Sequence, residues 1–268
     1  MTDIQEKLHR LKEILQGCQG AVLAFSGGVD STFLAAIAQD VLKDKLLLVT
    51  ASSETYPQHE KEAALETARL LGARHQLIFT RELFDENFVA NSPQRCYFCK
   101  KELFSRLWEI ARENGFSAVL DGANYDDLGD YRPGMRAAGE LEVKSPLFEA
   151  MLTKEEIKVL SREMGLPTWA KPSMACLASR FPYGERITEE KLLMVSKAED
   201  YLRSLGLDII RVRHHGNLAR LEVAPEDFSR IISMAGEIEK ELRSIGYIYV
   251  TLDLKGFRSG SMNEAMGA

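Results

Sequence analysis

Apolar positions in the first part of the chain follow two alternating patterns. Four short runs have the length and apolar character of buried strands: 21–25, 45–51, 75–80 and 118–120. The stretches around them have helical spacing of apolar residues: 4–16, 32–42, 57–71 and 97–114. Strands that are apolar on both faces and alternate with helices are typical of a parallel sheet covered on both sides. We therefore predict an α/β fold with a doubly wound parallel sheet for residues 1–168.

The pattern changes towards the C-terminus. A capping box at Thr153 and Glu156 opens one more helix, to about Met164. Residues 169–186 are rich in proline and carry few helical signals, so we predict a connecting loop there, which contains Cys176. The order of signals in 187–268 is typical of a small α+β domain. Its expected elements are a helix at 188–205, a hairpin of strands at 209–214 and 218–223, a helix at 225–245 and a strand at 247–254.

A glycine loop lies between the first predicted strand and the helix that follows it. Residues 26–32 read Ser-Gly-Gly-Val-Asp-Ser-Thr. Adjacent glycines let backbone N–H groups turn towards a ligand, and the N-terminus of the next helix presents its positive end at the same point. The hydroxyls of Ser26 and Ser31 add donors. The loop predicts a phosphate cradle, although its spacing matches neither a Walker P-loop nor a dinucleotide-binding fingerprint.

Polar residues also follow two other predicted strands. Ser52 and Ser53 end the second strand, and Gly122 follows the fourth. Because the carboxyl ends of parallel strands meet at one edge, where nucleotides bind, we expect a nucleotide site there. For the two serines, a polar loop without a ligand is the alternative. The stretch 121–134 is rich in charges, and its Asp126 and Asp127 would suit either Mg²⁺, which prefers carboxylates with phosphate oxygens, or a substrate.

Three cysteines indicate metal or sulfur chemistry. Cys96 and Cys99 form a Cys-x-x-Cys pair at a predicted helix start, which suits one metal, a cluster or a redox pair. Cys176 lies beside Ser179 and Arg180, and a nearby positive charge favours a reactive thiolate. Three thiolates without a fourth would hold a 4Fe–4S cluster with one iron open to a further ligand, such as a sulfide.

Charge and hydropathy exclude some classes of partner. Lys and Arg number 34 against 40 Asp and Glu, and this net charge of −6 argues against a nucleic-acid backbone as the partner. No apolar run approaches the roughly 18–20 residues of a membrane span, and residues 1–16 lack the apolar core of a signal peptide. We expect a cytoplasmic protein that binds neither membranes nor nucleic acid.

Residues 25–32 resemble the PP-loop of the N-type ATP pyrophosphatases, which cleave ATP between the α and β phosphates. Three further stretches, 122–134, 176–184 and 258–263, extend the likeness to nearly the whole chain. Together they resemble the LarE-type ATP-dependent sulfur insertases, the pyridinium-3,5-bisthiocarboxylic acid mononucleotide synthases. The resemblance implies an adenine nucleotide alpha hydrolase-like domain at 1–168, and a substrate-phosphate and oligomerisation domain at 187–268. It also implies a homo-oligomer, by resemblance a hexamer.

The resemblance assigns roles to residues of this chain. Those implied to bind ATP are Ala24, Ser26, Gly27, Gly28, Asp30, Ser31, Ser52, Ser53 and Gly122. The implied catalytic residues are Cys176, Ser179 and Arg180. Arg211 and Arg213 would bind the substrate's phosphate, because residues two apart in a strand share a face and paired guanidinium groups suit a phosphate monoester. Asp30, Asp126 and Asp127 are the candidates for Mg²⁺, and Cys96, Cys99 and Cys176 those for an iron–sulfur cluster.

The implied reaction turns carboxylates into thiocarboxylates. ATP would adenylate a carboxylate of pyridinium-3,5-biscarboxylic acid mononucleotide, and sulfur would displace AMP on the way to the nickel-pincer nucleotide cofactor. In one branch of the family a single cysteine, matching Cys176, gives up its sulfur and becomes dehydroalanine. The Cys96/Cys99 pair favours the other branch, in which three cysteines hold a 4Fe–4S cluster and a bound sulfide is transferred.

Three other functions remain open from the sequence. A PP-loop tRNA thiolase would use the same ATP chemistry, but the net charge argues against it. An ammonia-dependent amide-forming ligase has no need of the three cysteines. A nucleotide-sensing binding module would release no pyrophosphate.

Overall fold

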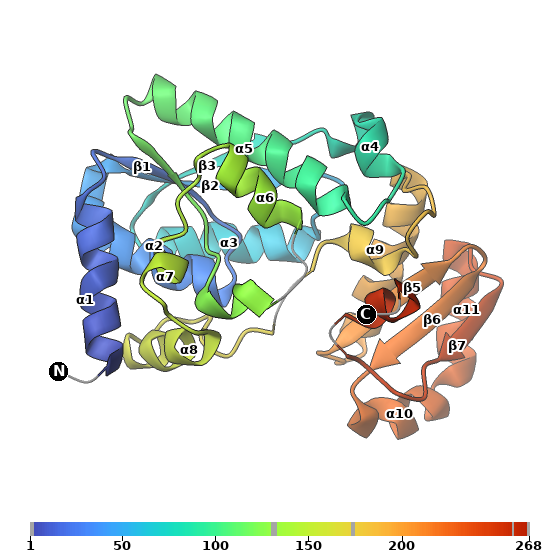
Figure 1. The fold of residues 1–268 in the computed structure, drawn as a ribbon. Helices are drawn as coiled ribbons and strands as arrows, with labels where there is room; N and C mark the ends of the chain where they lie inside the picture. The colour runs from blue at the N-terminus through green and yellow to red at the C-terminus, as the bar shows by residue number, and fades with distance from the viewer. Residues whose placement is uncertain (1–2, 130–132, 173–174, 259, 267–268) are drawn as a thin grey trace. The chain divides into compact units, whose positions relative to one another are not determined.

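The computed structural model describes residues 3–129, 133–172, 175–258 and 260–266 (Figure 1). The chain divides into two compact units. Unit 1 consists of Met1–Glu82 and Gln94–Met174, and unit 2 of Leu83–Pro93 and Ala175–Ala268. None of the described helices is long and apolar enough to cross a membrane.

A four-stranded parallel sheet forms the centre of unit 1. Its strands are β1 (Ala21–Ala24), β2 (Leu46–Ser52), β3 (Arg74–Phe79) and β4 (Ala118–Leu120), in the order β3-β2-β1-β4. The α/β fold class predicted from the apolar pattern is therefore confirmed. The chain runs outwards from β1 to β3 and then returns to place β4 on the other side of β1, so the strand order reverses beside the carboxyl end of β1, where such folds bind ligands.

Helices cover both faces of this sheet, as Figure 1 shows. The helices of unit 1 are α1 (Asp3–Gln16), α2 (Val29–Leu42), α3 (Gln58–Leu70), α5 (Arg95–Glu113), α6 (Pro133–Glu140), α7 (Pro146–Glu149) and α8 (Lys154–Glu163). Leu23 of β1 packs with Phe33 of α2 and Leu160 of α8 on one face. Its neighbour Val22 points the other way and packs with Phe104 of α5, as alternation along a strand requires.

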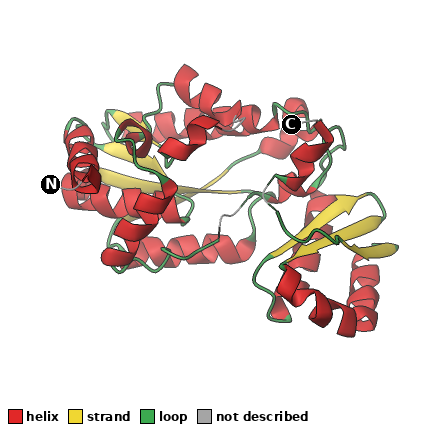
Figure 2. Cartoon of the chain, turned by 60° about the horizontal axis from the view of Figure 1, so that its bottom comes forward, coloured by secondary structure: helices red, strands yellow, loops and turns green. Residues whose placement is uncertain are grey.

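Unit 2 is built on a smaller sheet (Figure 2). Its strands are β5 (Ile210–His215), β6 (Leu218–Val223) and β7 (Tyr249–Leu252), in the order β5-β6-β7. Strands β5 and β6 form the predicted antiparallel hairpin, whereas β7 runs parallel to β6. The helices are α4 (Glu86–Val89), α9 (Glu189–Ser204), α10 (Phe228–Ser233) and α11 (Ala235–Ile245). Apolar side chains of α9, α11 and one sheet face form the core, and the charged side chains of β5 and β6 lie on the other face.

Two differences from the prediction concern unit 2. The single helix expected at 225–245 is a short 3-10 turn followed by α10 and α11, which meet at Met234. The segment Leu83–Pro93 lies within the first domain in the sequence, but it belongs to unit 2. Asn91 donates its side-chain amide to the carbonyl of Pro182 at 2.7 Å, and the N–H of Ile187 donates to Val89 at 2.9 Å.

Candidate functional site

The glycine loop connects β1 to α2. Ala24 is the last residue of the strand and Val29 the first of the helix. The hydroxyl oxygens of Ser26 and Ser31 lie 3.1 Å apart, and the N–H of Gly28 donates to the Ser26 hydroxyl at 3.4 Å. The N-cap residue of α2 is Gly28, which has no side chain to cap the helix. Because the first N–H groups of a helix favour an anion, this loop has the features of a phosphate cradle.

Gly27 cannot carry a side chain in this loop. Its φ is +65°, and a Cβ built there would lie 2.8 Å from the Cα of Ala64 in α3. Backbone strain and a clash with the backbone of a helix therefore both select glycine. The hydroxyl of Tyr56 fixes the preceding residue, because it donates to the carbonyl of Ser26 at 2.8 Å.

Asp30 lies in the first turn of α2 and is paired with a lysine. Its Oδ2 is 2.5 Å from Nζ of Lys154, the first residue of α8, and its buried Oδ1 accepts no hydrogen bond from the described residues. Lys154 was not predicted as a site residue. The two lie 124 residues apart, so no local pattern connects them.

A second lysine, also missed in the sequence, contacts the loop from the segment after α8. Nζ of Lys171 donates to the carbonyl of Gly27 at 3.1 Å and lies 2.6 Å from the Glu60 carboxylate. The Glu60 side chain is almost fully buried. Its charge thus holds the ammonium group against the loop.

The other strand ends lie where the sequence predicts. Ser52 closes β2, and the hydroxyl of Ser53 donates to the buried Glu82 carboxylate at 2.9 Å. Gly122 follows β4 and approaches α2 closely: a Cβ there would lie 3.3 Å from the backbone nitrogen of Ser31. The carboxyl ends of β1 and β4 therefore meet beside the glycine loop.

The two candidate magnesium ligands after β4 hold the local backbone. Asp126 accepts from the N–H of Lys154 at 2.8 Å, and Asp127 accepts from the N–H of Asn124 at 3.0 Å. Asp130 and Arg132, in the same charged stretch, lie outside the described residues. In the described part of the chain, no three His, Cys, Asp or Glu side chains come together as a metal site requires.

Cys96 and Cys99 lie in the first turn of α5, three residues apart, and so share a helix face. Cys96 is exposed and Cys99 half-buried. Cys176 belongs to unit 2, so neither unit by itself assembles the three thiols predicted to hold a cluster.

Arg180 organises the backbone around Cys176. Its fully buried guanidinium pairs with both carboxylate oxygens of Glu199, at 2.8 and 2.9 Å. The remaining nitrogen donates to the carbonyls of Ala175 and Cys176, at 2.8 and 3.2 Å, and to the Ser179 hydroxyl at 3.0 Å. The contact with Cys176 is thus to its carbonyl, and the guanidinium charge is neutralised by Glu199, a residue that the sequence analysis missed.

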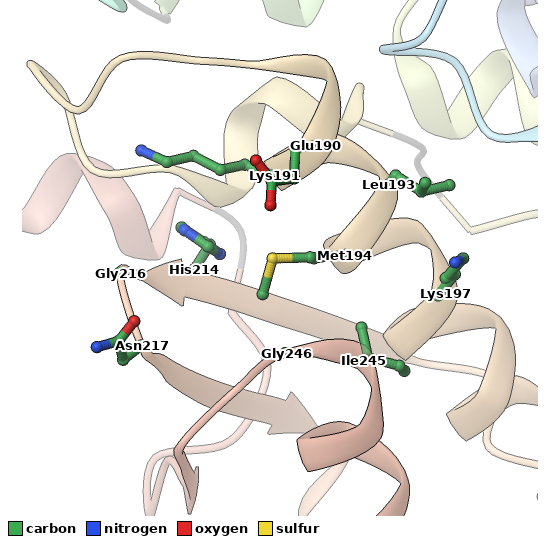
Figure 3. Close-up of a pocket in the computed structure, with 10 residues that line it drawn as sticks. All are labelled: Glu190, Lys191, Leu193, Met194, Lys197, His214, Gly216, Asn217, Ile245 and Gly246. Carbon is green, nitrogen blue, oxygen red and sulfur yellow. The ribbon is translucent and has the colours of Figure 1, made fainter.

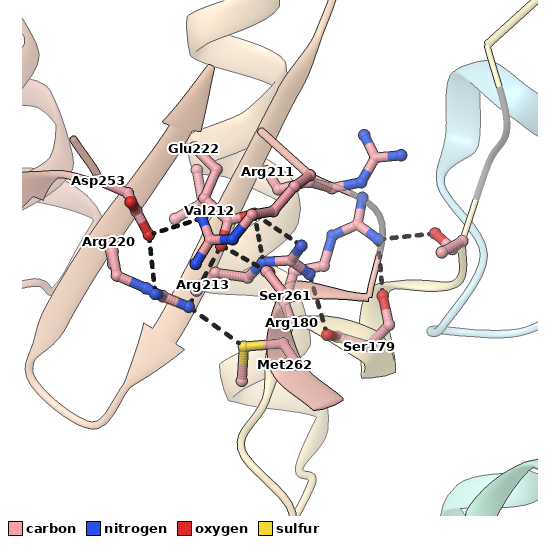
Figure 4. A network of polar contacts seen from close by, with 12 residues as sticks. Ser179, Arg180, Arg211, Val212, Arg213, Arg220, Glu222, Asp253, Ser261 and Met262 are labelled. Carbon is pink, nitrogen blue, oxygen red and sulfur yellow. Dashed lines mark hydrogen bonds and ion pairs between the residues drawn. The ribbon is translucent and has the colours of Figure 1, made fainter. Parts of the chain in front are cut away.

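Arg211 and Arg213 lie at alternate positions of β5, on the charged sheet face (Figure 4). Arg213 donates to Oε2 of the buried Glu222 at 2.7 and 3.0 Å, and to the carbonyl of Ser179 at 3.2 Å. Arg211 lies over the ring of Phe257. Burial, together with the nearby positive charge of Arg180, lowers the pKa of Arg211 to about 10.

The C-terminal motif that supported the family resemblance reaches the same face (Figure 4). The hydroxyl of Ser261 donates to Oε1 of Glu222 at 2.7 Å, and both side chains are buried. The sequence shows the motif but not its contact, which spans 39 residues. Ser261 and Arg213 therefore share one carboxylate.

Unit 2 also contains a cavity of about 450 Å³ away from these residues (Figure 3). It lies between α9, the turn of the hairpin and the end of α11. Its lining includes Lys191, Met194, His214, Asn217 and Gly246. It contains none of the residues predicted to bind ATP or to transfer sulfur.

The chain is similar to several known proteins over much of its length. A family model described as NAD synthase matches residues 4–108. A pyridinium-3,5-bisthiocarboxylic acid mononucleotide synthase from Lactiplantibacillus plantarum is 40% identical over 267 residues, which cover 99% of this chain and 97% of that protein. An uncharacterized protein of Synechocystis is 44% identical over 98% of this chain and 99% of its own. An uncharacterized protein of Methanocaldococcus jannaschii is 30% identical over 89% of this chain and 90% of its own.

Proposed function

Because the chain belongs to the LarE-type sulfur insertases, ATP-dependent enzymes of the PP-loop pyrophosphatase family, we propose that it inserts sulfur into pyridinium-3,5-biscarboxylic acid mononucleotide. The observation that carries the proposal is the glycine loop. Its paired serine hydroxyls, its obligatory Gly27 and the uncapped α2 form a site for the phosphates of ATP. Asp30, with one carboxylate oxygen unpartnered among the described residues, would take part in holding Mg²⁺.

The first step would be adenylation. A carboxylate oxygen of the substrate attacks the α-phosphorus of ATP, the α–β phosphoanhydride bond breaks, and pyrophosphate leaves. The product is an acyl adenylate, in which AMP has become a good leaving group. Arg211 and Arg213 would bind the substrate's own phosphate, since they are guanidinium groups on one face of β5.

The second step would bring in sulfur. The thiolate of Cys176 attacks the acyl carbon, and AMP departs with the former carboxylate oxygen. Removal of the Cys176 Cα proton then breaks its Cβ–S bond, which leaves a thiocarboxylate on the substrate and dehydroalanine in the protein. Arg180 and Glu199 support this role because they fix the backbone of the cysteine's loop.

A second source of sulfur is proposed from the three-cysteine pattern. Cys96, Cys99 and Cys176 would hold a 4Fe–4S cluster, which would supply a bound sulfide and so spare the cysteine. The start of α5, where the exposed Cys96 and the half-buried Cys99 share a helix face, fits two of the three ligands. Iron and sulfide analysis after anaerobic purification separates the two routes. Dehydroalanine at position 176 with no iron after reconstitution supports the sacrificial route, and stoichiometric iron with intact Cys176 after turnover supports the cluster.

The experiment for the whole proposal supplies ATP, magnesium and the biscarboxylate nucleotide to the full chain. Pyrophosphate, AMP and a thiocarboxylate product are the expected results, and Asp30→Ala should abolish pyrophosphate release. An Asp30→Ala variant with full pyrophosphate release would remove the glycine loop from the mechanism. We also propose a homo-oligomer assembled through unit 2, a hexamer by resemblance, which sedimentation velocity tests directly.

A further inference from the structure

The stretch 176–184, which supports the family resemblance, extends past the residues that have a role in the proposed sulfur transfer. Those residues end at Arg180, and residues 181–184 follow directly. Their backbone contacts a segment about 90 residues away in the sequence, Leu83–Pro93, which belongs to the same unit. This segment therefore has a place at the cysteine's loop that the order of the sequence does not reveal.

We propose that Asn91 is a positioning residue for sulfur transfer, which fixes the loop of Cys176 at its C-terminal end, whereas Arg180 holds its N-terminal end. The inference rests on the proposed function, because Cys176 is the residue whose position it explains. Both proposed sources of sulfur use Cys176, so the inference does not depend on which of them operates.

Asn91 binds the loop from the interior of unit 2. Its side chain is fully buried, and its amide donates to the carbonyl of Pro182 at 2.7 Å and to that of Phe181 at 3.5 Å. Its own backbone carbonyl accepts from the N–H of Gly184 at 3.0 Å. One residue therefore holds the backbone of the loop at three points.

The backbone of Asn91 is itself in an uncommon conformation. Its φ is +51°, which few residues other than glycine adopt and which asparagine adopts more often than most. Such a conformation persists where the surroundings hold it. Here the N–H of Ile187 donates to the carbonyl of Val89 at 2.9 Å, and Arg186 pairs with Glu86 at 2.7 and 2.8 Å. Helix α4 and the residues after it thus lie along the loop that precedes α9 (Figure 1).

The two anchors lie on either side of one short turn. The Arg180 guanidinium donates to the carbonyl of Cys176 at 3.2 Å, and the 3-10 turn that follows the cysteine ends at Arg180. The next residue is Phe181, the first whose carbonyl Asn91 binds. Without Asn91 the turn would be held at one end only, and its thiol would be free to shift. A displacement of about 1 Å in a reacting group can cost on the order of a hundredfold in rate.

The functional test compares thiocarboxylate formation with pyrophosphate release in a single turnover of the full chain. Asn91→Gly keeps the positive φ at low cost and removes the amide, whereas Asn91→Asp keeps the size and removes the N–H donor. In both variants the rate of thiocarboxylate formation should fall at least about tenfold. Pyrophosphate release should stay at the wild-type rate, because the glycine loop belongs to unit 1.

Hydrogen exchange, followed by mass spectrometry of peptides that cover 176–187, tests the anchor itself. Asn91→Gly should speed exchange at Gly184, whose N–H it binds, and also at Ser179, whose N–H donates to the carbonyl of Cys176 at 2.9 Å. Faster exchange at Ser179 would show that the loss of Asn91 reaches the turn beside the cysteine.

Two control variants separate positioning from stability. Glu86→Gln breaks an exposed ion pair of the same segment, and Ile238→Val trims a buried side chain of α11 elsewhere in unit 2. Neither should change exchange at Ser179 or the rate of thiocarboxylate formation, even where Ile238→Val lowers the melting temperature.

Two results would overturn the inference. One is a wild-type rate of thiocarboxylate formation in both Asn91 variants. The other is a loss that Ile238→Val reproduces at a similar melting temperature, which is the result of a purely structural role. Failure of the proposed function gives a different result: the wild-type chain then forms no thiocarboxylate, while the exchange experiment still shows whether Asn91 holds the loop.

Discussion

The buried pair of Arg180 and Glu199 provides the sharpest test of how unit 2 holds the cysteine loop. Glu199→Ala would leave the guanidinium of Arg180 buried without its carboxylate, and the N–H of Val212, which donates to Glu199 at 3.0 Å, without its acceptor. Breaking a buried pair from one side costs about 3–5 kcal/mol. That is a large fraction of the stability of an ordinary domain, roughly 5–15 kcal/mol.

The tryptophans of the chain allow the unfolding of unit 1 to be followed separately. Its two tryptophans, Trp108 and Trp169, both lie in unit 1. Urea unfolding followed by tryptophan fluorescence therefore reports on unit 1, whereas far-UV circular dichroism reports on both units. Glu199→Ala should lower the midpoint of part of the dichroism transition and leave the fluorescence transition unchanged. Coincident transitions that match the wild type would refute the reasoning.

The double variant Arg180→Met/Glu199→Leu separates stability from function. Replacing both members of a buried pair by apolar residues is often neutral or stabilising, so unit 2 should regain most of its stability. The carbonyls of Ala175 and Cys176 would still lack their common donor, and sulfur transfer should stay low. Recovery of full activity would show that Arg180 does not position Cys176.

Further predictions concern the loop, pH and the C-terminal motif. Gly27→Ala should lower ATP affinity and destabilise unit 1 by at least about 1–2 kcal/mol, because of the positive φ and the contact with Ala64. Unfolding followed by tryptophan fluorescence measures the stability, and unchanged stability with unchanged ATP affinity would contradict this. Burial lowers the pKa of His214 below 6.5, so the folded form resists protonation and unit 2 should lose stability as pH falls below 6.5, a dependence that His214→Phe should reduce. Ser261→Ala should raise the KM for the nucleotide substrate about tenfold, because it removes the hydrogen bond that Ser261 donates to the buried carboxylate of Glu222, the partner of Arg213; an unaltered KM would exclude Ser261 from the proposed phosphate site.

Glu199 adds a second pH dependence, which comes from its attraction to Arg180 rather than from burial. Burial alone raises the pKa of Glu199, but the adjacent Arg180 charge and its hydrogen bonds outweigh burial and lower it. A carboxylate whose pKa is lower in the folded chain than in the unfolded chain stabilises the fold at any pH above its unfolded pKa. That stabilisation is lost as the pH falls through its folded pKa. Unit 2 should therefore lose this contribution only below about pH 4.5, and Glu199→Gln should remove the dependence.

Local sequence signals predicted the strands of the unit 1 sheet and the start of α8. The apolar runs of unit 1 became the four strands of a parallel sheet, and the capping box of Thr153 and Glu156 has both of its hydrogen bonds. The break between α10 and α11 was missed because Ser233 and Met234 carry no strong helix-stopping chemistry. The grouping of Leu83–Pro93 with unit 2 depends on contacts with residues about 100 positions away, which no local pattern records.

The candidate site likewise has one part that the local sequence predicts and another that it does not. Its glycine loop could be predicted because turn, helix start and hydroxyl donors are adjacent in the sequence. Lys154, Lys171 and Glu199 could not, because each acts through a partner that only the tertiary fold brings near. The reactive thiolate predicted for Cys176 beside Arg180 stays a prediction, because the guanidinium donates to the cysteine's carbonyl and its charge is paired with Glu199.

We propose that cleavage of ATP to AMP and pyrophosphate, by way of an acyl adenylate, drives transfer of sulfur from this chain to a carboxylate. The most direct measurement is mass spectrometry of the nucleotide product and of the intact protein after one turnover of anaerobically purified chain with ATP, magnesium and the biscarboxylate nucleotide. The account predicts a product in which sulfur has replaced a carboxylate oxygen, matched by sulfur lost from Cys176 or from protein-bound sulfide. Pyrophosphate release with an oxygen-only product and an unchanged protein would contradict it.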